Sequence, residues 1–235
     1  MELKYDSIKF PETDPEHVNS VNRLYKMLLS KRVFSVEPSR NPITPRVVWM
    51  IQSYIQLTIH RAIDLFDILS TAWADSKPSV AFVLTRAVVE NAAAMYDLYD
   101  RLDSQLRVDE FKGIHEIISV RLMGGRDKES PPVIPNILGA IDKTDERYEG
   151  FRPSYDLLSE FAHPNYSGMH GLYGKVDRET VTLYIDGSRG INDATFSFIL
   201  FPLHLSLRVL LDSIHKIESL YPAIWYLSDK EENES

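Results

Sequence analysis

The sequence contains no cysteine, which excludes disulfide bonds, thiolate zinc sites and thiol catalysis and agrees with a reducing cytoplasm. It also lacks any window of about 18 uninterrupted apolar residues, the length that a membrane span requires. The richest window, 194–211, contains Pro202, His204 and Arg208. The N-terminal segment MELKYDSIKF has no apolar core of the kind that signal peptides carry. We therefore expect a soluble, cytoplasmic protein that does not contact a membrane.

A cluster of Lys and Arg is also missing, and the net charge is −8. Proteins that bind nucleic acid through its phosphates normally present a basic face, so this composition disfavours such a substrate unless a local basic groove exists. The length of 235 residues, of which 44% are hydrophobic, is enough to bury a sizeable core. We expect one helical domain over residues 1–235.

Helical patterns fill most of the chain. Asp14-Pro15-Glu16 is typical of a helix start, and this helix should reach about Arg32. Thr44-Pro45 should open a long amphipathic helix, and Asp75-Ser76-Lys77-Pro78 should begin a helix that ends near Leu102. Four further helices are predicted, at 107–123, at 136–147, from Pro153 to His163, and at 192–219.

The segment 168–190 has a different pattern. Glycines punctuate it, and YGKVD and TVTLYI alternate around Arg178-Glu179, which predicts a β-hairpin inserted into the helical body. Residues 1–13 should form an irregular arm, 125–135 a mobile loop and 228–235 a disordered acidic tail. The predicted fold class is therefore mainly α, a helical bundle with a small β-hairpin insertion.

Two polar segments stand out against this apolar background. From Val80 to Tyr96 the chain is almost wholly apolar, and a helix that is apolar around most of its circumference is buried. Arg86 and Glu90 lie four residues apart within it, on one face. Because isolated buried charges are very costly, polar groups from elsewhere in the chain should face this pair.

The segment 155–165, YDLLSEFAHPN, is the best candidate for that partner. Tyr155, Ser159 and His163 recur every fourth residue, which places two hydroxyl groups and an imidazole along one helical line. Pro164 disfavours helical backbone at His163, so the helix should end there. We expect His163 to lie near Glu90, and the five side chains to form either a polar network that fixes helix packing or a small catalytic pocket.

The R-x-x-x-E helix followed by Y-x-x-L-S-E-x-A-H-P-N resembles the DUF5677-like group of uncharacterised bacterial helical proteins, over roughly residues 80–190. That group is compared with the HEPN superfamily of helical ribonucleases and defence proteins. The resemblance implies a helical bundle and a role in phage defence or a toxin system, without an established reaction.

A second candidate site lies in the last predicted helix. Arg208 and His215 match the R-x(4–6)-H pattern of HEPN ribonucleases, in which the arginine and histidine act on RNA phosphate at a dimer interface. The pattern is short enough to arise by chance, and Val209 stands where that family usually has a polar residue. His204, Arg208, Asp212 and His215 share one helical stripe. The alternative interpretation is that this stripe is only the polar flank beside the leucine seam of the helix.

No cofactor or metal site is indicated. The turn Asp186–Gly190 lacks the spacing of a phosphate loop, and His163 and His170 do not have a recognised metal spacing. His60 and Asp64 fit a solvated helix face better than a pair of ligands. The apolar seam of 192–219 suits packing in a bundle or across a homodimer. We therefore expect a homodimer, with RNA or another phosphate-bearing molecule as ligand, or else a non-catalytic interaction protein.

Overall fold

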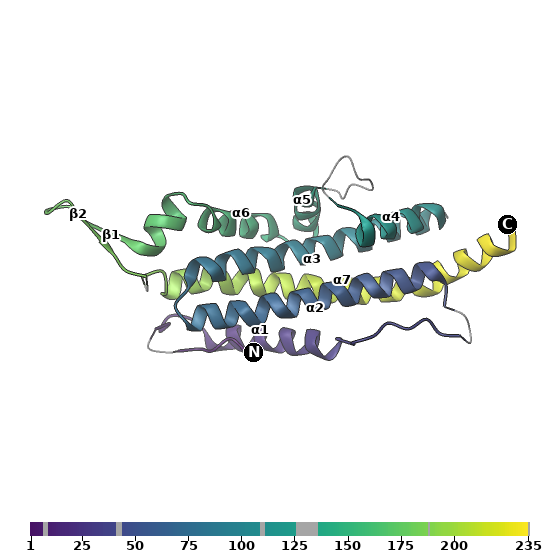
Figure 1. Ribbon diagram of the computed structural model, residues 1–235, viewed down its shortest axis with the longest axis horizontal. Coiled ribbons are helices and arrows are strands. Elements are labelled where there is room, and N and C mark those ends of the chain that lie inside the picture. Colours follow the sequence, from purple (N-terminus) through teal and green to yellow (C-terminus); the bar gives the residue numbers. More distant parts are fainter. Residues whose placement is uncertain (7–8, 41–43, 109–110, 126–135, 188, 235) are drawn as a thin grey trace.

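The structure is a computed structural model that describes residues 1–6, 9–40, 44–108, 111–125, 136–187 and 189–234, with side chains as far as Glu231. It confirms a mainly α-helical bundle with a small two-stranded hairpin (Figure 1). In chain order the elements are α1 (Pro15–Ser30), α2 (Arg46–Ala74), α3 (Pro78–Arg107), α4 (Phe111–Met123), α5 (Ile137–Arg147), α6 (Phe151–Ala162), the short π-helical segment η1 (Ser167–Gly171), β1 (Gly174–Asp177), β2 (Thr182–Ile185) and α7 (Asp193–Glu234).

Helix α3 is the centre of the bundle, as its apolar composition predicted. It packs against α2, α4, α5, α6 and α7, and most extensively against α7 (Figure 1). Its inward side chains belong to a single continuous core and include Ala81, Phe82, Val88, Val89, Ala92, Ala93, Met95, Leu98 and Leu102. The bundle therefore surrounds the helix that carries Arg86 and Glu90.

The helix ends follow the local chemistry of the chain. The Asp14 carboxylate accepts a hydrogen bond of 2.9 Å from the backbone of Glu16 and caps α1. Pro78 is the first residue of α3, where a backbone N–H would have no hydrogen-bond partner within the helix, so the N–H that proline lacks is not missed. His163 has extended backbone (ψ 151°) and ends α6 immediately before Pro164, as the sequence predicted.

Helix α7 extends well beyond its predicted end. The expected stop near residue 219 and the disordered tail from Ser228 are both wrong for the described residues, because the helix continues to Glu234. Pro222 is exposed, and beyond it Ile224, Leu227 and Ser228 are buried, so side-chain burial stabilises the helix past Pro222 as far as Ser228. The apolar seam of α7 packs within the bundle, where Phe196, Ile199, Leu203, Leu207, Leu210, Ile214 and Ile217 are all fully buried.

By length and composition alone, residues 193–231 of α7 would be able to cross a membrane. However, 67% of the relevant apolar window is buried inside the bundle. The core helix of a soluble protein has the same composition, so α7 is weak evidence for a membrane span.

In its described residues, 1–6 and 9–13, the N-terminal arm has no helix or strand but is fixed to the bundle. The backbone N–H of Leu3 donates to Asn22 on α1 (2.9 Å), and Leu3 and Phe10 are buried. The Phe10 ring stacks on Phe196 of α7, with ring centroids 4.4 Å apart. The mobile loop predicted at 125–135 lies outside the described residues, apart from Gly125.

The hairpin projects from one end of the bundle (Figure 1). Strands β1 and β2 pair in antiparallel fashion, with Gly174 opposite Ile185 and Asp177 opposite Thr182. The Asp177 carboxylate accepts hydrogen bonds from the backbone of Glu179 (2.8 Å) and Thr180 (3.2 Å) and so shapes the turn. Val181 completes this turn with a φ of +54°, a conformation that β-branched residues rarely adopt.

Candidate functional site

Helices α3 and α6 bring Arg86, Glu90 and Tyr155 together, as the two sequence motifs predicted. Arg86 Nη2 donates a 2.6 Å hydrogen bond to the Tyr155 hydroxyl, and the guanidinium carbon lies 4.8 Å from the centre of the Tyr155 ring. The Tyr155 hydroxyl in turn lies 3.5 Å from Glu90 Oε1, at the limit of a hydrogen bond. Arg86 and Glu90, one helical turn apart, form a loose ion pair with 3.4 Å between Nε and Oε1.

The expectation that Arg86 and Glu90 sit inside the fold is only partly correct. Tyr155 is buried, but the side chains of Arg86 and Glu90 are 27% and 28% exposed, because α6 covers this side of α3 incompletely. Arg86 Nε is buried and has no hydrogen-bond acceptor among the described residues. A guanidinium has five N–H donors, and here the Tyr155 hydroxyl takes one of them, so the group retains capacity to bind an anion.

Ser159 and His163 do not complete the cluster as predicted. The Ser159 hydroxyl donates to the Tyr155 carbonyl one turn back (2.8 Å), which leaves it no proton for the carboxylate of Glu90. His163 is exposed, and within the described part of the chain its ring forms no hydrogen bond or ion pair with Glu90 or Arg86. The reason is the direction of α6. Tyr155 contacts Arg86 and Glu90, whereas Phe161 stacks on Phe82 with ring centroids 4.3 Å apart, so the end of α6 that carries His163 lies toward the start of α3 and away from Glu90.

The secondary candidate pair on α7 is open to solvent. Arg208 and His215 are both exposed, on the same face of α7 and about 10 Å apart along the helix axis. Between them, Asp212 is occupied by Lys216 (2.8 Å) and by the Tyr148 hydroxyl. The structure therefore leaves Arg208 and His215 accessible but does not join them through a shared polar group.

A buried charge cluster at the other end of α3 escaped sequence reasoning. The Asp97 side chain is only 7% exposed and accepts hydrogen bonds from Arg101 Nε (2.8 Å) and from Arg121 Nη2. Arg121, on α4, is itself 11% exposed. Only the one-turn spacing of Asp97 and Arg101 was visible in the sequence, because the contact with Arg121 depends on how α4 packs. The cluster fixes α4 to α3.

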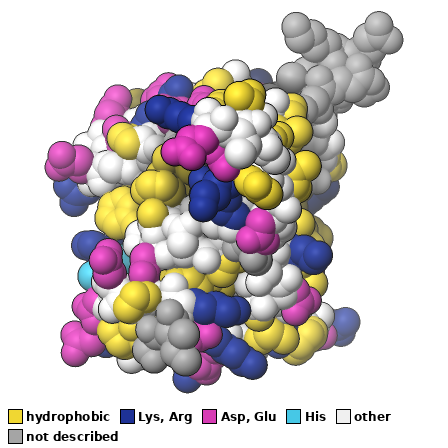
Figure 2. Space-filling model, turned by 90° about the vertical axis from the view of Figure 1, so that its left-hand side faces the viewer, with side chains coloured by type: hydrophobic (Ala, Val, Ile, Leu, Met, Phe, Trp, Pro, Cys, Tyr) yellow, Lys and Arg dark blue, Asp and Glu magenta, His cyan; other side chains and the backbone are white. Residues whose placement is uncertain are grey.

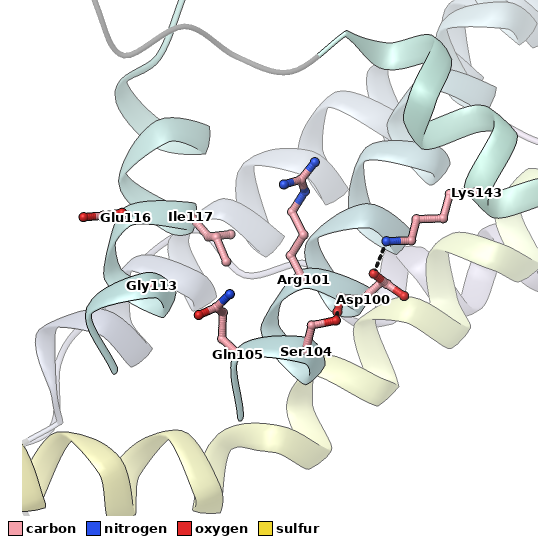
Figure 3. A pocket seen from close by; sticks show the side chains of 8 residues that line it. All are labelled: Asp100, Arg101, Ser104, Gln105, Gly113, Glu116, Ile117 and Lys143. Carbon is pink, nitrogen blue, oxygen red and sulfur yellow. Dashed lines mark hydrogen bonds and ion pairs between the residues drawn. The ribbon is translucent and has the colours of Figure 1, made fainter. Parts of the chain in front are cut away.

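A polar hollow of about 440 Å³ lies next to that cluster, between α3, α4 and α5 (Figure 3). It is lined by Asp100, Arg101, Ser104, Gln105, Gly113, Glu116, Ile117 and Lys143. Lys143 forms an ion pair with Asp100, and Arg101 is bonded to Asp97, so the two cations that line the hollow already have carboxylate partners. Both pairs are closer than the 3.4 Å ion pair of Arg86 with Glu90, so the hollow is a weaker anion site than Arg86.

A third polar cluster joins α5 and α7 around Lys216. Its ammonium group lies 2.8 Å from Asp212 and 3.2 Å from the Tyr148 hydroxyl, over the faces of Tyr99 and Tyr148. Burial by itself would lower the pKa of Lys216, but the hydrogen bonds to Asp212 and Tyr148 raise it. Lys216 is therefore held as a cation that links two helices.

Among the described residues, no group of three or more His, Asp or Glu side chains is placed to hold a metal ion. His60 contacts the Val33 carbonyl (2.8 Å) through Nε2, and Asp64 is exposed. No family model, curated protein or solved structure matches the chain.

Proposed function

We propose that the chain is a cytoplasmic, phosphate-directed protein of the phage-defence or toxin type, with a ribonuclease-like site at Arg86, Glu90 and Tyr155. The observation that supports this most is the state of Arg86. Its guanidinium is anchored by the Tyr155 hydroxyl and ring and by the 3.4 Å ion pair of its buried Nε with Glu90, and the side chain remains 27% exposed. A fixed guanidinium with spare donors is the group that binds phosphate best in proteins.

Arg86, Tyr155 and Glu90 would have different roles in the reaction. Arg86 binds two oxygens of a phosphodiester and offsets the charge that develops on phosphorus. Tyr155, hydrogen-bonded to Arg86 at 2.6 Å, fixes the orientation of the guanidinium. Glu90 lies within reach of the same position and accepts the proton of the attacking hydroxyl group as its oxygen bonds to phosphorus. The bond from phosphorus to the leaving oxygen breaks in the same step, and water supplies the proton that this oxygen takes up. His163, exposed further along the chain, engages a neighbouring phosphate of an RNA ligand, and Ser159 keeps its part of α6 in register.

The test measures binding and cleavage separately. Arg86→Gln should weaken the binding of inorganic phosphate and of a short RNA by about tenfold to a hundredfold, the loss expected for charge-assisted hydrogen bonds. Glu90→Gln should retain phosphate binding and abolish cleavage, and His163→Ala should weaken RNA binding more than phosphate binding. The matched control is Arg107→Gln, which removes one exposed cation from the same helix and should change neither.

Variants of the secondary site test whether Arg86, or instead Arg208 with His215, forms the ribonuclease-like site. Arg208→Gln and His215→Gln should leave phosphate binding and cleavage at the level of the unmodified chain if Arg86 is the phosphate ligand. Loss of cleavage in these variants, with Arg86→Gln still active, would move the site to α7 and refute the present assignment.

A non-catalytic interaction protein is the alternative, and one observation favours it. The Tyr155 hydroxyl lies between Arg86 and Glu90, and the Ser159 hydroxyl donates to a backbone carbonyl. These polar groups therefore already have hydrogen-bond partners within the protein. In that case Arg86→Gln and Glu90→Gln would lower the melting temperature strongly, and neither the unmodified chain nor the variants would bind phosphate.

A further inference from the structure

The β-hairpin has one polar and one apolar face, and both are open to water. Directly opposed residues of an antiparallel pair project from the same face. Lys175, Asp177, Thr182 and Tyr184 therefore share one face, and Val176, Leu183 and Ile185 share the other. Leu183 is 52% exposed and Ile185 is 79% exposed. An isolated two-stranded hairpin is only marginally stable in water, so an uncovered apolar face on such an element indicates a docking surface.

Ile185 is the most exposed of the strand's apolar side chains for a specific reason. The residue opposite it on β1 is Gly174, which has no side chain to cover it. Val181 at the tip of the hairpin is 84% exposed and adopts a positive φ, although glycine or asparagine would adopt that conformation at lower cost. The hairpin therefore carries apolar side chains at positions where the fold itself does not bury them.

The hydrogen-bond pattern shows which strand edge is open. The Asp186 N–H donates to the Tyr173 carbonyl, and in an antiparallel ladder such bonded pairs alternate with non-bonded ones. By the observed register, the backbone groups of Lys175 and Tyr184 face each other, and those of Leu183 and Ile185 point away from β1. The outward carbonyl of Gly174 on β1 accepts a hydrogen bond from Arg189. The outward groups of Leu183 and Ile185 have no partner among the described residues.

We propose that β2 pairs edge to edge with β2 of a second copy of the chain, about a two-fold axis through Tyr184, to form a four-stranded intermolecular sheet. Only outward-pointing groups can bond across this edge. We choose the register in which Leu183 lies opposite Ile185 of the other copy, and the reverse, because it pairs the outward groups of both residues in each copy. This register is self-complementary. Each Ile185 gains from the other copy the apolar neighbour that Gly174 does not supply, and the two Tyr184 side chains meet on the opposite face.

The surroundings of the hairpin favour this occupant over a nucleic acid or an acidic or basic partner. The hairpin projects clear of the helices (Figure 1), and every residue of β2 is exposed, so the helices of its own chain do not cover the edge of β2. The end of the molecule that carries it shows Lys and Arg interspersed with Asp and Glu, without a large area of one sign (Figure 2). The seam of α7, the other surface suited to a dimer, is buried within the fold.

The absence of cysteine makes a background-free test possible. Tyr184→Cys places one thiol of each copy at the two-fold axis, in a non-bonded pair whose Cβ atoms approach to about 4.5–5.5 Å, near the distance of a disulfide. The control, Lys175→Cys, lies beside Tyr184 on the same exposed face but one strand further from the axis. Under mild oxidation, we expect covalent dimers from Tyr184→Cys at least about tenfold faster than from Lys175→Cys. Equal rates would overturn the proposed register.

A charge exchange tests the same register without oxidation. The double variant Leu183→Lys/Ile185→Lys places like charges opposite each other and should be monomeric by analytical ultracentrifugation. Leu183→Glu/Ile185→Lys places opposite charges across the axis and should recover the dimer, most clearly at low salt. Because one hairpin edge is a small interface, the dissociation constant should lie in the micromolar to millimolar range. An unmodified chain that stays monomeric at millimolar concentration would refute the interface, whatever the phosphate assays show.

Discussion

At the residue scale, His204 on α7 has the clearest electrostatic conflict with its surroundings. Its Nε2 lies 3.2 Å from the Ser20 hydroxyl on α1, and the charged or titratable groups around it are Arg208, His17 and Arg23. Burial lowers the pKa of His204, and the neighbouring Arg208, His17 and Arg23 lower it further. The fold therefore favours the neutral imidazole.

The free energy of unfolding should fall on acidification because of His204. Since the pKa of His204 is lower in the folded chain than its ordinary value of 6.5, the unfolded chain binds this proton more readily. The stability linked to neutral His204 is fully present above pH 6.5 and is lost as the pH falls through the folded-state pKa. In urea unfolding at pH values between about 7.5 and 5, His204→Gln should lose less stability on acidification than the unmodified chain.

His215→Gln is the matched control, because His215 is exposed on the same helix. It should preserve the pH dependence of the unmodified chain. If both variants changed that dependence equally, the location of the effect at His204 would be wrong.

Arg86 and His163 show where helix spacing predicts a contact correctly and where it does not. The pairing of Arg86 with Glu90 and Tyr155 followed from helix spacing and the cost of buried charge, and the structure brings the three together. The spacing also predicts His163 on the same helical line, at the end of α6 before Pro164. A shared line does not bring His163 to Glu90, because α6 runs antiparallel to α3: Tyr155 contacts Glu90, and Phe161 stacks on Phe82 nearer the start of α3.

At the scale of elements, the attachment of α4 depends on the buried carboxylate of Asp97. Asp97→Ala would leave Arg101 and Arg121 adjacent without their shared anion, so we expect a loss of about 3–5 kcal/mol in the free energy of unfolding. Hydrogen exchange should rise in α4 before it rises in α2 or α7. Urea unfolding and native-state exchange measure these two effects.

Asp103→Ala provides the comparison on the same helix. Asp103 pairs with Arg107, whose side chain is 77% exposed, and such surface pairs contribute at most about 1 kcal/mol. Similar losses for Asp97→Ala and Asp103→Ala would show that burial of Asp97 does not determine its contribution.

Some helix ends are specified by neighbouring residues, and others by contacts between distant parts of the chain. Capping residues and prolines specify where α1 and α3 begin and where α6 ends, and all of these are readable from a few neighbouring residues. The length of α7 is different. Its last turns form despite Pro222 and an acidic composition, because Ile224 and Leu227 are buried against the bundle, and that contact joins segments far apart in the sequence. The Asp97–Arg121 contact was hidden for the same reason.

At the scale of the whole molecule, one hydrophobic core runs through all the α-helices, from Val18 on α1 to Leu227 on α7. A shared core predicts a single cooperative unfolding transition. The chain has three tryptophans, Trp49, Trp73 and Trp225, at the two ends of α2 and near the end of α7. They provide separate optical probes of distant regions.

We expect the fluorescence of Trp73 alone and of Trp225 alone to report the same urea midpoint as far-UV circular dichroism. The variants needed are Trp49→Phe/Trp225→Phe and Trp49→Phe/Trp73→Phe. Each should be compared with circular dichroism of the same variant, because Trp73 is buried and its replacement shifts stability itself. Midpoints that differ between probes within one variant would reveal separately unfolding parts.

The central position of α3 has a consequence for synthesis of the polypeptide. Helix α7 is the most extensive neighbour of α3, and among these helices it is the last to be translated, beginning more than a hundred residues after the start of α3. Until then the nascent chain holds a strongly apolar helix that only α2 and the short helices α4 to α6 can shield. The interval before α7 emerges is therefore the stage at which aggregation or capture by a chaperone competes most effectively with folding.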